Sequence, residues 1–584
     1  MEKQTETFGS RFDGTDYAIN NGCLNLVVKK KVDEKFLQFN VRLLNGWFRL
    51  EVEITHDNGA DIEKSVEMTF LEMGGKKIAA RVPVKDILNN NYLLPYSIDC
   101  RPVVGPRNKS LIVDSILAQA AQTPRVTIYQ QTGWRKIGGK YAFLNAGGAI
   151  GANGITVELS GRNVNYFFTD SDSPGRYKTV KKFLDAAPRT ITIPLLAFAF
   201  LSPLCEVFRR ARIEPSFILM LLGVTGSMKS TLAALALNFF GEAWNNKNLP
   251  HSFKDTANAL EKSLFLLADV LTVIDDLHPA GSKIEAARMA ATFQAVSRSV
   301  GDRTGRQRMN ADASLRQSYV PRSNVIITGE DFPDIGQSGT ARNIIIELKK
   351  GDVDIPVLTD IQSHTAHLAE SMRDFIKWLL PQYDKLPEVL KKHFLILRER
   401  AQGVGHGRTA EAIAHLQIGI SIFLKFMCEV RAFTEAECDS IRNESWQIFI
   451  KLADEQNRRI QQDKPTILFL SALKELLDTK EYNIESIKRV HPYSNPPEDS
   501  LGFFDDDYIY LYPETAYKAI KQFYNAADRN FPLSKSQLFK HLQSEGLIEA
   551  GEDRSTKPKK IRGENKRLLW LKASALEVKN ETGG

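Results

Sequence analysis

Four short, continuous apolar runs alternate with helical periodicity within residues 191–350. They read FILMLLG (217–223), VLTVIDDL (270–277), NVIITGE (324–330) and NIIIEL (343–348). A strand that is apolar at nearly every position must be buried on both faces, which is typical of parallel strands between two layers of helices. The pattern therefore predicts an α/β domain with a parallel sheet in the middle of the chain.

The first run leads into the loop GVTGSMKST, and the loop leads into the apolar helical stretch TLAALALNFF. A strand, loop and helix in this order point backbone N–H groups and a helix N-terminus at a phosphate. We expect the loop to bind ATP, with Lys229 reaching the β- and γ-phosphate oxygens and the Ser230 hydroxyl on Mg²⁺. The expected nucleotide-binding residues are Gly223, Val224, Thr225, Gly226, Ser227, Met228, Lys229, Ser230 and Thr231.

Met228 stands where the usual phosphate-loop pattern has its second glycine. We expect it at the start of the helix with helical backbone angles, which an L-residue can adopt, and with its side chain turned away from the nucleotide. A chance match in a Gly/Ser loop is the alternative. The strand before the loop and the helix after it argue against that alternative.

Polar side chains end the next two runs. We expect Asp275 to coordinate Mg²⁺, directly or through water, and Asp276 to polarise the water that attacks the phosphate. Asp276 is one methylene shorter than the glutamate that most ATP-driven motors have there, which bears on hydrolysis rate more than on binding. Thr328 is expected to orient the same water. The alternative is a strand that merely ends in solvated acids.

Arg342 directly precedes the fourth run. In ring ATPases an arginine at this place reaches across the subunit boundary to the neighbour's γ-phosphate. We expect that role for Arg342, and an ordinary surface arginine is the alternative.

These residues resemble the MCM-like AAA+ helicases carried by bacterial cassette chromosomes, pathogenicity islands and phages. The resemblance covers residues 110–430 well and residues 1–100 loosely, and it departs at Met228 and Asp276. The TANALE segment before the acidic strand is its most specific piece, because phosphate loops alone are widespread. The shared segments are GWRK (133–136), the loop at 223–231, DTANALEKSLFLLADVLTVIDDL (255–277), GDRTGRQRMNADASLRQ (301–317), VIITGED (325–331), SGTARNIIIEL (338–348) and GRTAEAIAHLQIGISIFLK (407–425).

The resemblance implies an AAA+ phosphate-loop core that uses ATP and Mg²⁺, in a homo-oligomeric ring, a hexamer, acting on single- and double-stranded DNA. It implies that Arg408, at the start of a helix in the lid, senses the γ-phosphate; one surface arginine among many is the alternative. The sequence has no primase signature, so a primase or a loader would be a separate replication partner.

The resemblance also implies a β-hairpin that points into the channel of the ring. Its guanidinium groups would follow a phosphate backbone without reading sequence. A solvated basic loop is the alternative. The arginines concerned are Arg303, Arg306, Arg308 and Arg316.

The C-terminal segment predicts a winged helix. Two amphipathic helices, ETAYKAIKQFYNAA and SKSQLFKHLQSEGLI (534–548), precede a strand pair around a basic, turn-rich stretch at 551–572. The second helix would enter a DNA groove and the basic wing would contact phosphates, although many winged helices bind protein instead. The wing residues expected to bind DNA are Lys557, Lys559, Lys560 and Arg562, with Arg554, Lys566 and Arg567 beside them.

The composition fits a globular protein, with 43% hydrophobic and 25% charged residues and a net charge of +7. Five scattered cysteines favour reduced thiols and a cytoplasmic location, and the apolar stretch 193–205 is too short to span a membrane, so it predicts a buried helix. The expected domains are a strand-rich N-terminal domain (1–110), an α+β connecting region (111–190), the ATPase core with its helical lid (191–430), a helical linker (431–490) and the winged helix (500–584).

Three functions fit these features. The first is an ATP-dependent DNA helicase or translocase that forms a ring and replicates a mobile element or a phage genome. The second is an origin-binding or clamp protein that uses ATP only to assemble, which Met228 and Asp276 favour. The third is an ATPase that remodels protein, which leaves the basic hairpin unexplained.

Overall fold

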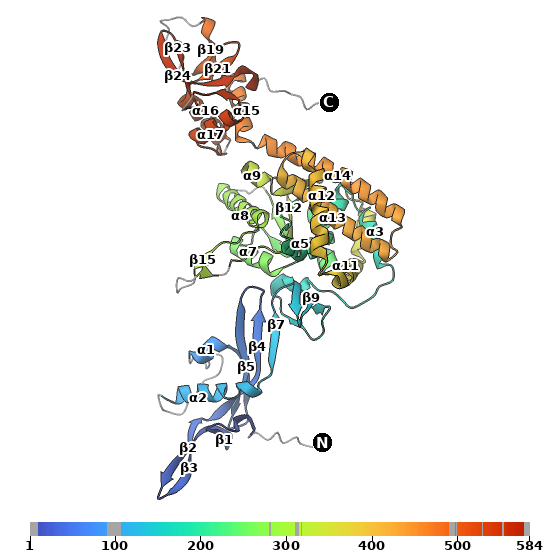
Figure 1. The fold of residues 1–584 in the computed structure, drawn as a ribbon, viewed down its shortest axis with the longest axis vertical. Coiled ribbons are helices and arrows are strands. Elements are labelled where there is room, and N and C mark those ends of the chain that lie inside the picture. Colours follow the sequence, from blue (N-terminus) through green and yellow to red (C-terminus); the bar gives the residue numbers. More distant parts are fainter. Residues whose placement is uncertain are drawn as a thin grey trace.

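The computed structural model describes residues 10–89, 91, 107–278, 282–309, 315–316, 318–489, 497, 499–527, 529–551 and 554–576. Figure 1 shows an elongated molecule in which N-terminal strands, a central α/β body and a C-terminal unit follow one another along the long axis. The main buried apolar clusters keep to these three parts, so each part has a core of its own.

The N-terminal part is built on a sheet with the strand order β11-β7-β4-β5-β6. Helices α1 (Val84–Leu88) and α2 (Asn108–Leu117) share a buried cluster with β4 and β5. A second sheet projects at the lower end of Figure 1 as the ribbon β2–β3. The strands of this part are β1 (Tyr17–Asn20), β2 (Cys23–Val32), β3 (Lys35–Leu44), β4 (Gly46–Asp57), β5 (Ile62–Glu72), β6 (Lys77–Pro83), β7 (Arg125–Tyr129) and β11 (Thr156–Val157).

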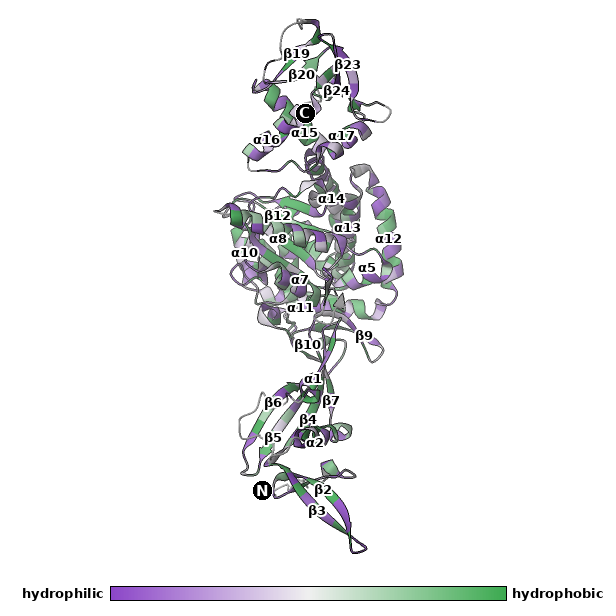
Figure 2. Ribbon diagram, turned by 90° about the vertical axis from the view of Figure 1, so that its left-hand side faces the viewer, coloured by the Kyte–Doolittle hydropathy of each residue, from purple (hydrophilic) through white to green (hydrophobic). Residues whose placement is uncertain are grey.

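The central body contains a parallel sheet with the order β13-β14-β17-β12-β18. Nearly every residue of its four longer strands is buried, as the continuous apolar runs require, and β12 is largely hydrophobic in Figure 2. The order places β17 between β12 and β14, so all three strands end side by side. The strands are β12 (Ile218–Leu222), β13 (His251–Ser252), β14 (Leu271–Leu277), β17 (Asn324–Gly329) and β18 (Asn343–Glu347).

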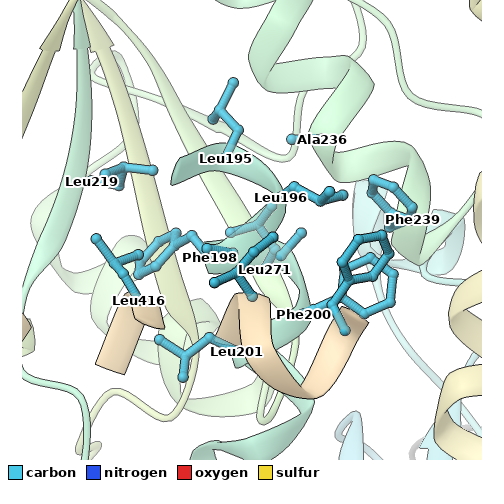
Figure 3. Close-up of a cluster of buried hydrophobic side chains, with 14 of the residues drawn as sticks. Leu195, Leu196, Phe198, Phe200, Leu201, Leu219, Ala236, Phe239, Leu271 and Leu416 are labelled. Atoms are coloured by element: carbon cyan, nitrogen blue, oxygen red, sulfur yellow. The ribbon is translucent and has the colours of Figure 1, made fainter. Parts of the chain in front are cut away.

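Helix α4 (Arg189–Leu201) occupies the centre of this body. Figure 3 shows its apolar side chains between Leu219 of β12, Leu271 of β14 and Leu416 of α13 (Gly407–Glu429). Gly419 lets α13 approach closely, because a Cβ atom there would lie 2.3 Å from the Ala197 carbonyl oxygen. Two helical stretches are long and apolar enough to cross a membrane, Arg189–Ala211 and Gly407–Glu429, but both are mostly buried here, so core packing accounts for their apolarity.

Further helices surround the sheet. Helix α12 lies at the outside and alternates polar and apolar residues in Figure 2. These helices are α3 (Arg176–Phe183), α5 (Cys205–Ala211), α6 (Lys229–Leu237), α7 (Ala257–Leu266), α8 (Lys283–Asp302), α9 (Gly336–Thr340), α10 (Ile355–Gln362), α11 (Thr365–Leu379), α12 (Leu386–Arg400) and α14 (Glu435–Gln462).

The C-terminal unit begins earlier than the sequence suggested. Phe469 and Leu473 of α15 are buried in one cluster with Leu538 of α17 and Leu571 of β24, so α15 belongs to this unit and the expected boundary at 500 is about one helix too late. The elements are α15 (Pro465–Asp478), α16 (Pro513–Ala526), α17 (Lys535–Ser544), β19 (Asn483–Ser486), β20 (Ser500–Phe504), β21 (Tyr508–Leu511), β22 (Ile548–Glu549), β23 (Lys557–Ile561) and β24 (Glu564–Lys572).

A buried carboxylate joins the connecting region to the central body. Asp269, just before β14, accepts hydrogen bonds from the backbone N–H of Trp134 (3.0 Å) and of Glu206 (2.8 Å). Burial raises the pKa of Asp269 to about 7, against the opposing pull of the Arg209 guanidinium. Gly133 has φ of +86°, and a Cβ atom there would lie 2.5 Å from the Asp269 carboxylate. This contact explains why a Gly-Trp pair starts the small sheet β8 (Gly133–Ile137), β9 (Lys140–Asn145) and β10 (Gly148–Ile150).

We expect Asp269→Ala to lower the free energy of unfolding by about 2–5 kcal/mol, because two buried N–H groups lose their acceptor. Denaturant unfolding of the purified protein measures this change. Asp170, whose side chain is 96% exposed, provides the control, and Asp170→Ala should change stability little. Equal stability of the two variants would contradict the role of Asp269 in this joint.

Candidate functional site

A cavity of about 360 Å³ opens where β12, β14 and β17 end. It collects residues from the loop after β12, from the acidic end of β14 and from the end of β17. The lining residues are Thr225, Gly226, Met228, Lys229, Ser230, Thr231, Asn246, Asp276, Leu277, Thr328, Gly329 and Glu330.

The loop between β12 and α6 presents groups that can bind an anion. Lys229, the first residue of α6, donates to the carbonyl oxygens of Gly223 (2.5 Å) and Val224 (3.1 Å), and burial lowers its pKa while nearby Glu330, Asp275 and Asp276 oppose that shift. The buried Ser227 hydroxyl has no hydrogen-bond partner. Gly223 admits no side chain, since a Cβ atom would lie 2.3 Å from the Leu348 carbonyl oxygen. A phosphate would find an ammonium group, a hydroxyl and a helix N-terminus here.

Three predicted residues meet at one carboxylate oxygen. The Ser230 hydroxyl donates to Asp275 Oδ1 at 2.6 Å, and the Thr328 hydroxyl donates to the same oxygen. A hydroxyl and a carboxylate are oxygen ligands that suit Mg²⁺, which commonly takes one or two protein carboxylates and completes its shell with phosphates and water. Within the described residues no group of three or more His, Cys, Asp or Glu could hold a metal by itself, so a metal at this place would need the nucleotide as a further ligand.

Asp276 differs from its neighbour in conformation and exposure. Its φ is +72°, and the pairing of β14 with β17 is irregular at this point. Its side chain is 45% exposed, with Lys254 Nζ at 3.9 Å and His278 Nε2 at 3.8 Å. Such a left-handed conformation at a non-glycine residue is uncommon and concentrates at functional sites. Asp275 is thus engaged within the site, whereas the Asp276 carboxylate remains open to the cavity.

The backbone of Met228 is not as the sequence suggested. Its φ and ψ are 66° and 24°, so it is left-handed at the N-cap of α6 and does not share the helical angles we expected. Its side chain packs against the central apolar cluster and also borders the cavity, so it is not fully turned away. The loop therefore keeps the conformation that suits glycine, at the cost of some backbone strain.

We expect Met228→Gly to be tolerated, because relief of this strain offsets the lost packing to within about 1 kcal/mol. Met228→Ala is the matched variant: it loses the packing but keeps the Cβ atom, and should be the less stable of the two. Calorimetric ATP binding and thermal unfolding measure both effects. Loss of ATP binding in Met228→Gly would contradict this description of the loop.

Sequence reasoning missed Glu330 and Asn246. Glu330 follows β17, accepts a hydrogen bond from the Thr225 hydroxyl and lines the cavity, as does Asn246. The position of Glu330 directly after an apolar run was a usable signal, because residues that follow parallel strands gather at one sheet edge. Asn246 lies in a loop with no comparable pattern.

The two predicted arginines, Arg342 and Arg408, lie away from this cavity and close to each other. Arg342 precedes the edge strand β18, and its carbonyl accepts from Ile218 N at the start of β12. The phosphate-binding loop follows the other end of β12. That end lies about 16 Å from the start of the strand, at ~3.3 Å per residue. Arg408 opens α13, and both guanidinium groups contact Asp302, the last residue of α8.

The basic segment expected to form the channel hairpin does contain a strand pair, but its arginines differ in exposure and in their contacts. β15 (Arg308–Met309) pairs antiparallel with β16 (Leu315–Arg316), and Figure 1 shows β15 projecting from the central body. Arg306 is exposed at its base, where its N–H donates to the Glu261 carboxylate at 2.9 Å. The side chains of Arg308 and Arg316 lie outside the described residues.

Arg303 was wrongly grouped with this hairpin. Its side chain is only 8% exposed and donates to the carbonyl oxygens of Pro215, Pro321 and Ser323. It anchors the end of α8, and no guanidinium N–H is presented to a DNA strand.

The basic stretch expected to form a wing contains the antiparallel pair β23–β24, and most of its cationic side chains are engaged within the protein. The Arg562 side chain is 6% exposed and pairs with Glu485 at 2.7 Å, so its expected DNA contact is not available in this structure. Lys557 pairs with Glu549 (2.5 Å) and Lys559 donates to the Tyr510 hydroxyl (2.7 Å). Lys560 is exposed, as are Arg554 and Arg567. Side chains along β23 alternate between a face that packs against the rest of the unit and a face that is open to solvent.

Comparison with known proteins gives a match to a family model and likenesses to solved structures. A family model described as a domain of unknown function, DUF927, matches residues 49–319. No curated protein matches this chain. The solved structure "SCCmec type IV Cch - active helicase" is similar at 14% identity with a TM-score of 0.60, covering 97% of this chain and 100% of that one.

Two further solved structures are far less similar. A JCV helicase with a bound inhibitor is 12% identical with a TM-score of 0.20, covering 54% of this chain and 81% of that one. The C-terminal region of NrS-1 is 10% identical with a TM-score of 0.23, covering 68% and 88%. Neither supports an argument at that score. The chain therefore shares the fold of the Cch helicase along nearly its whole length.

Proposed function

We propose that this protein is an ATP-dependent DNA helicase or translocase of the MCM-like AAA+ type. It would act as a homo-oligomeric ring, a hexamer, in the replication of a mobile element or phage genome, with primase or loader supplied by other proteins. One observation carries the proposal: Lys229, Ser230 and Thr328 line one cavity at the carboxyl edge of the parallel sheet, and the hydroxyls of Ser230 and Thr328 both donate to Asp275. The likeness of fold to a Cch helicase supports it.

We assign the following roles in hydrolysis, which the geometry of the cavity supports. Lys229 would stabilise the charge that develops on the transferring phosphoryl group, and Ser230 with Asp275 would hold Mg²⁺, which neutralises charge on the phosphates. Asp276, whose carboxylate is open to the cavity, would polarise the attacking water and accept its proton. Thr328 would keep Asp275 in place, because it donates to the carboxylate oxygen that Ser230 also uses.

The ring is proposed because the arginine pair cannot serve the cavity of its own chain. Arg342 and Arg408 do not line that cavity and lie toward the opposite end of the sheet. Placed at a subunit boundary, the pair would face the nucleotide of the neighbouring copy and stabilise charge only in the transition state.

DNA would be held at two places. The hairpin β15–β16 with Arg306, Arg308 and Arg316 would follow the strand in the channel, and a winged helix formed by α15 to β24 would bind duplex DNA through α17 and the open face of its wing. On that face we retain Lys560, with Arg554 and Arg567, as phosphate contacts.

An ATP-assembled origin-binding or clamp protein is the second candidate. The strained Met228 and the short Asp276 favour it, since both would slow turnover without preventing binding. Steady-state ATP hydrolysis with and without single-stranded DNA separates the two functions. A motor turns ATP over and is stimulated several-fold by DNA, whereas an assembly protein is slow and indifferent to it.

Removal of residues 465–584 should preserve ATP hydrolysis to within about twofold, because the central apolar cluster contains none of these residues. Binding to duplex DNA should fall by at least ~10-fold, since several phosphate contacts are lost. Fluorescence anisotropy with labelled duplex measures this loss of affinity. The double variant Lys560→Ala, Arg567→Ala should lose affinity for duplex DNA to a smaller extent. A folded, assembled truncation that cannot hydrolyse ATP would contradict the proposal.

A further inference from the structure

Glu261 is a buried carboxylate in helix α7, and it holds the base of the hairpin β15–β16. The residue is only 7% exposed, and its Oε1 atom accepts the backbone N–H of Arg306 at 2.9 Å, across 45 positions of sequence. A buried carboxylate is costly unless hydrogen bonds compensate it, and a charged acceptor makes a stronger hydrogen bond than a neutral one. The first leg of the hairpin is therefore tied firmly to α7.

The second leg of the hairpin is attached to the same helix. The Tyr319 ring packs against the Phe265 ring of α7, with 5.1 Å between the ring centroids. Arg322 then donates its backbone N–H to the Leu264 carbonyl oxygen (2.9 Å) and its Nε–H to the Phe265 carbonyl oxygen (2.7 Å). Gly305 lets the two legs approach each other, because a Cβ atom there would lie 2.7 Å from the Tyr319 carbonyl oxygen. Both legs thus stand on α7.

Helix α7 is also connected to the nucleotide cavity, through the backbone of Asp275. The Asp275 side chain accepts hydrogen bonds from Ser230 and Thr328 at the cavity. Its carbonyl oxygen accepts the N–H of Phe253 (3.1 Å), which lies between β13 and α7, and β13 pairs with β14 at the same residue. The apolar face of α7 is buried in one cluster with β14 and β17. A displacement of Asp275 would therefore reach α7 through hydrogen bonds and packed side chains.

We propose that Glu261 is a positioning residue that couples ATP hydrolysis to the hairpin β15–β16, with α7 as the rigid element between Asp275 and the hairpin. This inference rests on the proposed motor function. Glu261 accepts from a main-chain N–H, so the contact fixes the backbone of the hairpin and leaves the exposed Arg306 side chain to contact DNA. Glu261 itself borders a separate cavity of about 320 Å³ between α7 and α8, and as an anion it would not contact phosphates.

The test replaces Glu261 by alanine in the full-length protein, which removes the acceptor for the Arg306 N–H. Basal ATP hydrolysis should stay close to the wild-type rate, because the residues that line the nucleotide cavity are unchanged. Hydrolysis with single-stranded DNA should fall to the basal level, and unwinding should fall by about 10-fold or more, as expected when the coupling between two sites is lost. Phosphate release and strand displacement measure these rates. The matched control is Glu388→Ala, which removes an exposed carboxylate from α12 and should change neither rate.

Two further readouts separate coupling from a loss of fold and from a loss of DNA contact. The affinity of Glu261→Ala for single-stranded DNA and its dependence on salt should match those of the wild type, because no phosphate contact is removed. Glu261→Gln should retain part of the stimulation by DNA, because the amide oxygen can still accept the N–H. Loss of basal hydrolysis in Glu261→Ala, a loss of DNA affinity as large as that of Arg306→Ala, or no rescue by glutamine would overturn the proposal.

Gly305→Ala displaces the base of the hairpin in a second way, because its Cβ atom must push the Tyr319 carbonyl oxygen aside. It should also lose stimulation by DNA while basal hydrolysis remains. If Glu261→Ala fails to fold, Gly305→Ala decides the matter. Stimulation by DNA at the wild-type level, in Glu261→Ala or in this variant, refutes the inference. Absence of DNA-stimulated ATP turnover in the wild-type protein would instead refute the proposed function, so the two failures are distinguishable.

Discussion

Replacement of Lys229 by alanine is expected to abolish ATP hydrolysis and strand separation, with a loss in kcat of at least ~10²–10³-fold. The lysine is buried at the start of α6 and is held against the loop by the Gly223 and Val224 carbonyl oxygens. It thus supplies a preorganised positive charge where negative charge develops on the phosphoryl oxygens. Phosphate release measured with and without single-stranded DNA gives the effect directly.

The control for this substitution is Lys391→Ala. Lys391 is exposed on α12 and does not line the cavity, so its loss should leave kcat unchanged. If Lys229→Ala turned ATP over at the wild-type rate, the loop would not be the nucleotide site and the roles given to Ser230 and Asp275 would have no basis.

Simultaneous replacement of Arg306 and Arg308 by alanine is expected to remove the DNA-stimulated part of ATP hydrolysis and all unwinding, while basal hydrolysis remains. Arg306 lies exposed at the base of the projecting hairpin and Arg308 in its first strand. Phosphate contacts of this kind weaken as salt rises, so the variant should also show a shallower dependence of DNA affinity on salt.

The matched variant replaces Lys391 and Lys392, both exposed on α12, and so removes the same charge elsewhere. It should keep DNA stimulation. A hairpin variant that unwinds as well as this control would show that force is transmitted to DNA by other residues.

The sequence was most informative where burial leaves a continuous pattern. The four apolar runs coincide with β12, β14, β17 and β18, because a strand covered on both faces has no polar position to interrupt it. The strand β13 (His251–Ser252) has two residues, which is too short for any periodicity. The first helix of the C-terminal unit, α15, was assigned to a linker because its long separation from α16 hides their common core.

Charged residues were the least predictable part of the site. The loop pattern predicted a place at the site for Lys229 and Ser230, and the acidic end of a strand predicted one for Asp275. Both signals are local in the sequence. A basic residue in a turn-rich segment can equally serve structure, and Arg303 and Arg562 proved to be buried by carbonyl and carboxylate partners distant in sequence. The convergence of Arg342 and Arg408 on Asp302 spans 40 and 106 positions, and no sequence period reports it.

Strand separation on a forked DNA duplex is the measurement that tests the central claim most directly. The protein is mixed with a labelled fork and either ATP and Mg²⁺ or a non-hydrolysable ATP analogue, and release of the displaced strand is followed. A motor of the kind proposed opens the fork with ATP, fails with the analogue and fails with Lys229→Ala. Assembly on the fork with ATP, without displacement of the strand or with equal displacement by the analogue, would contradict it.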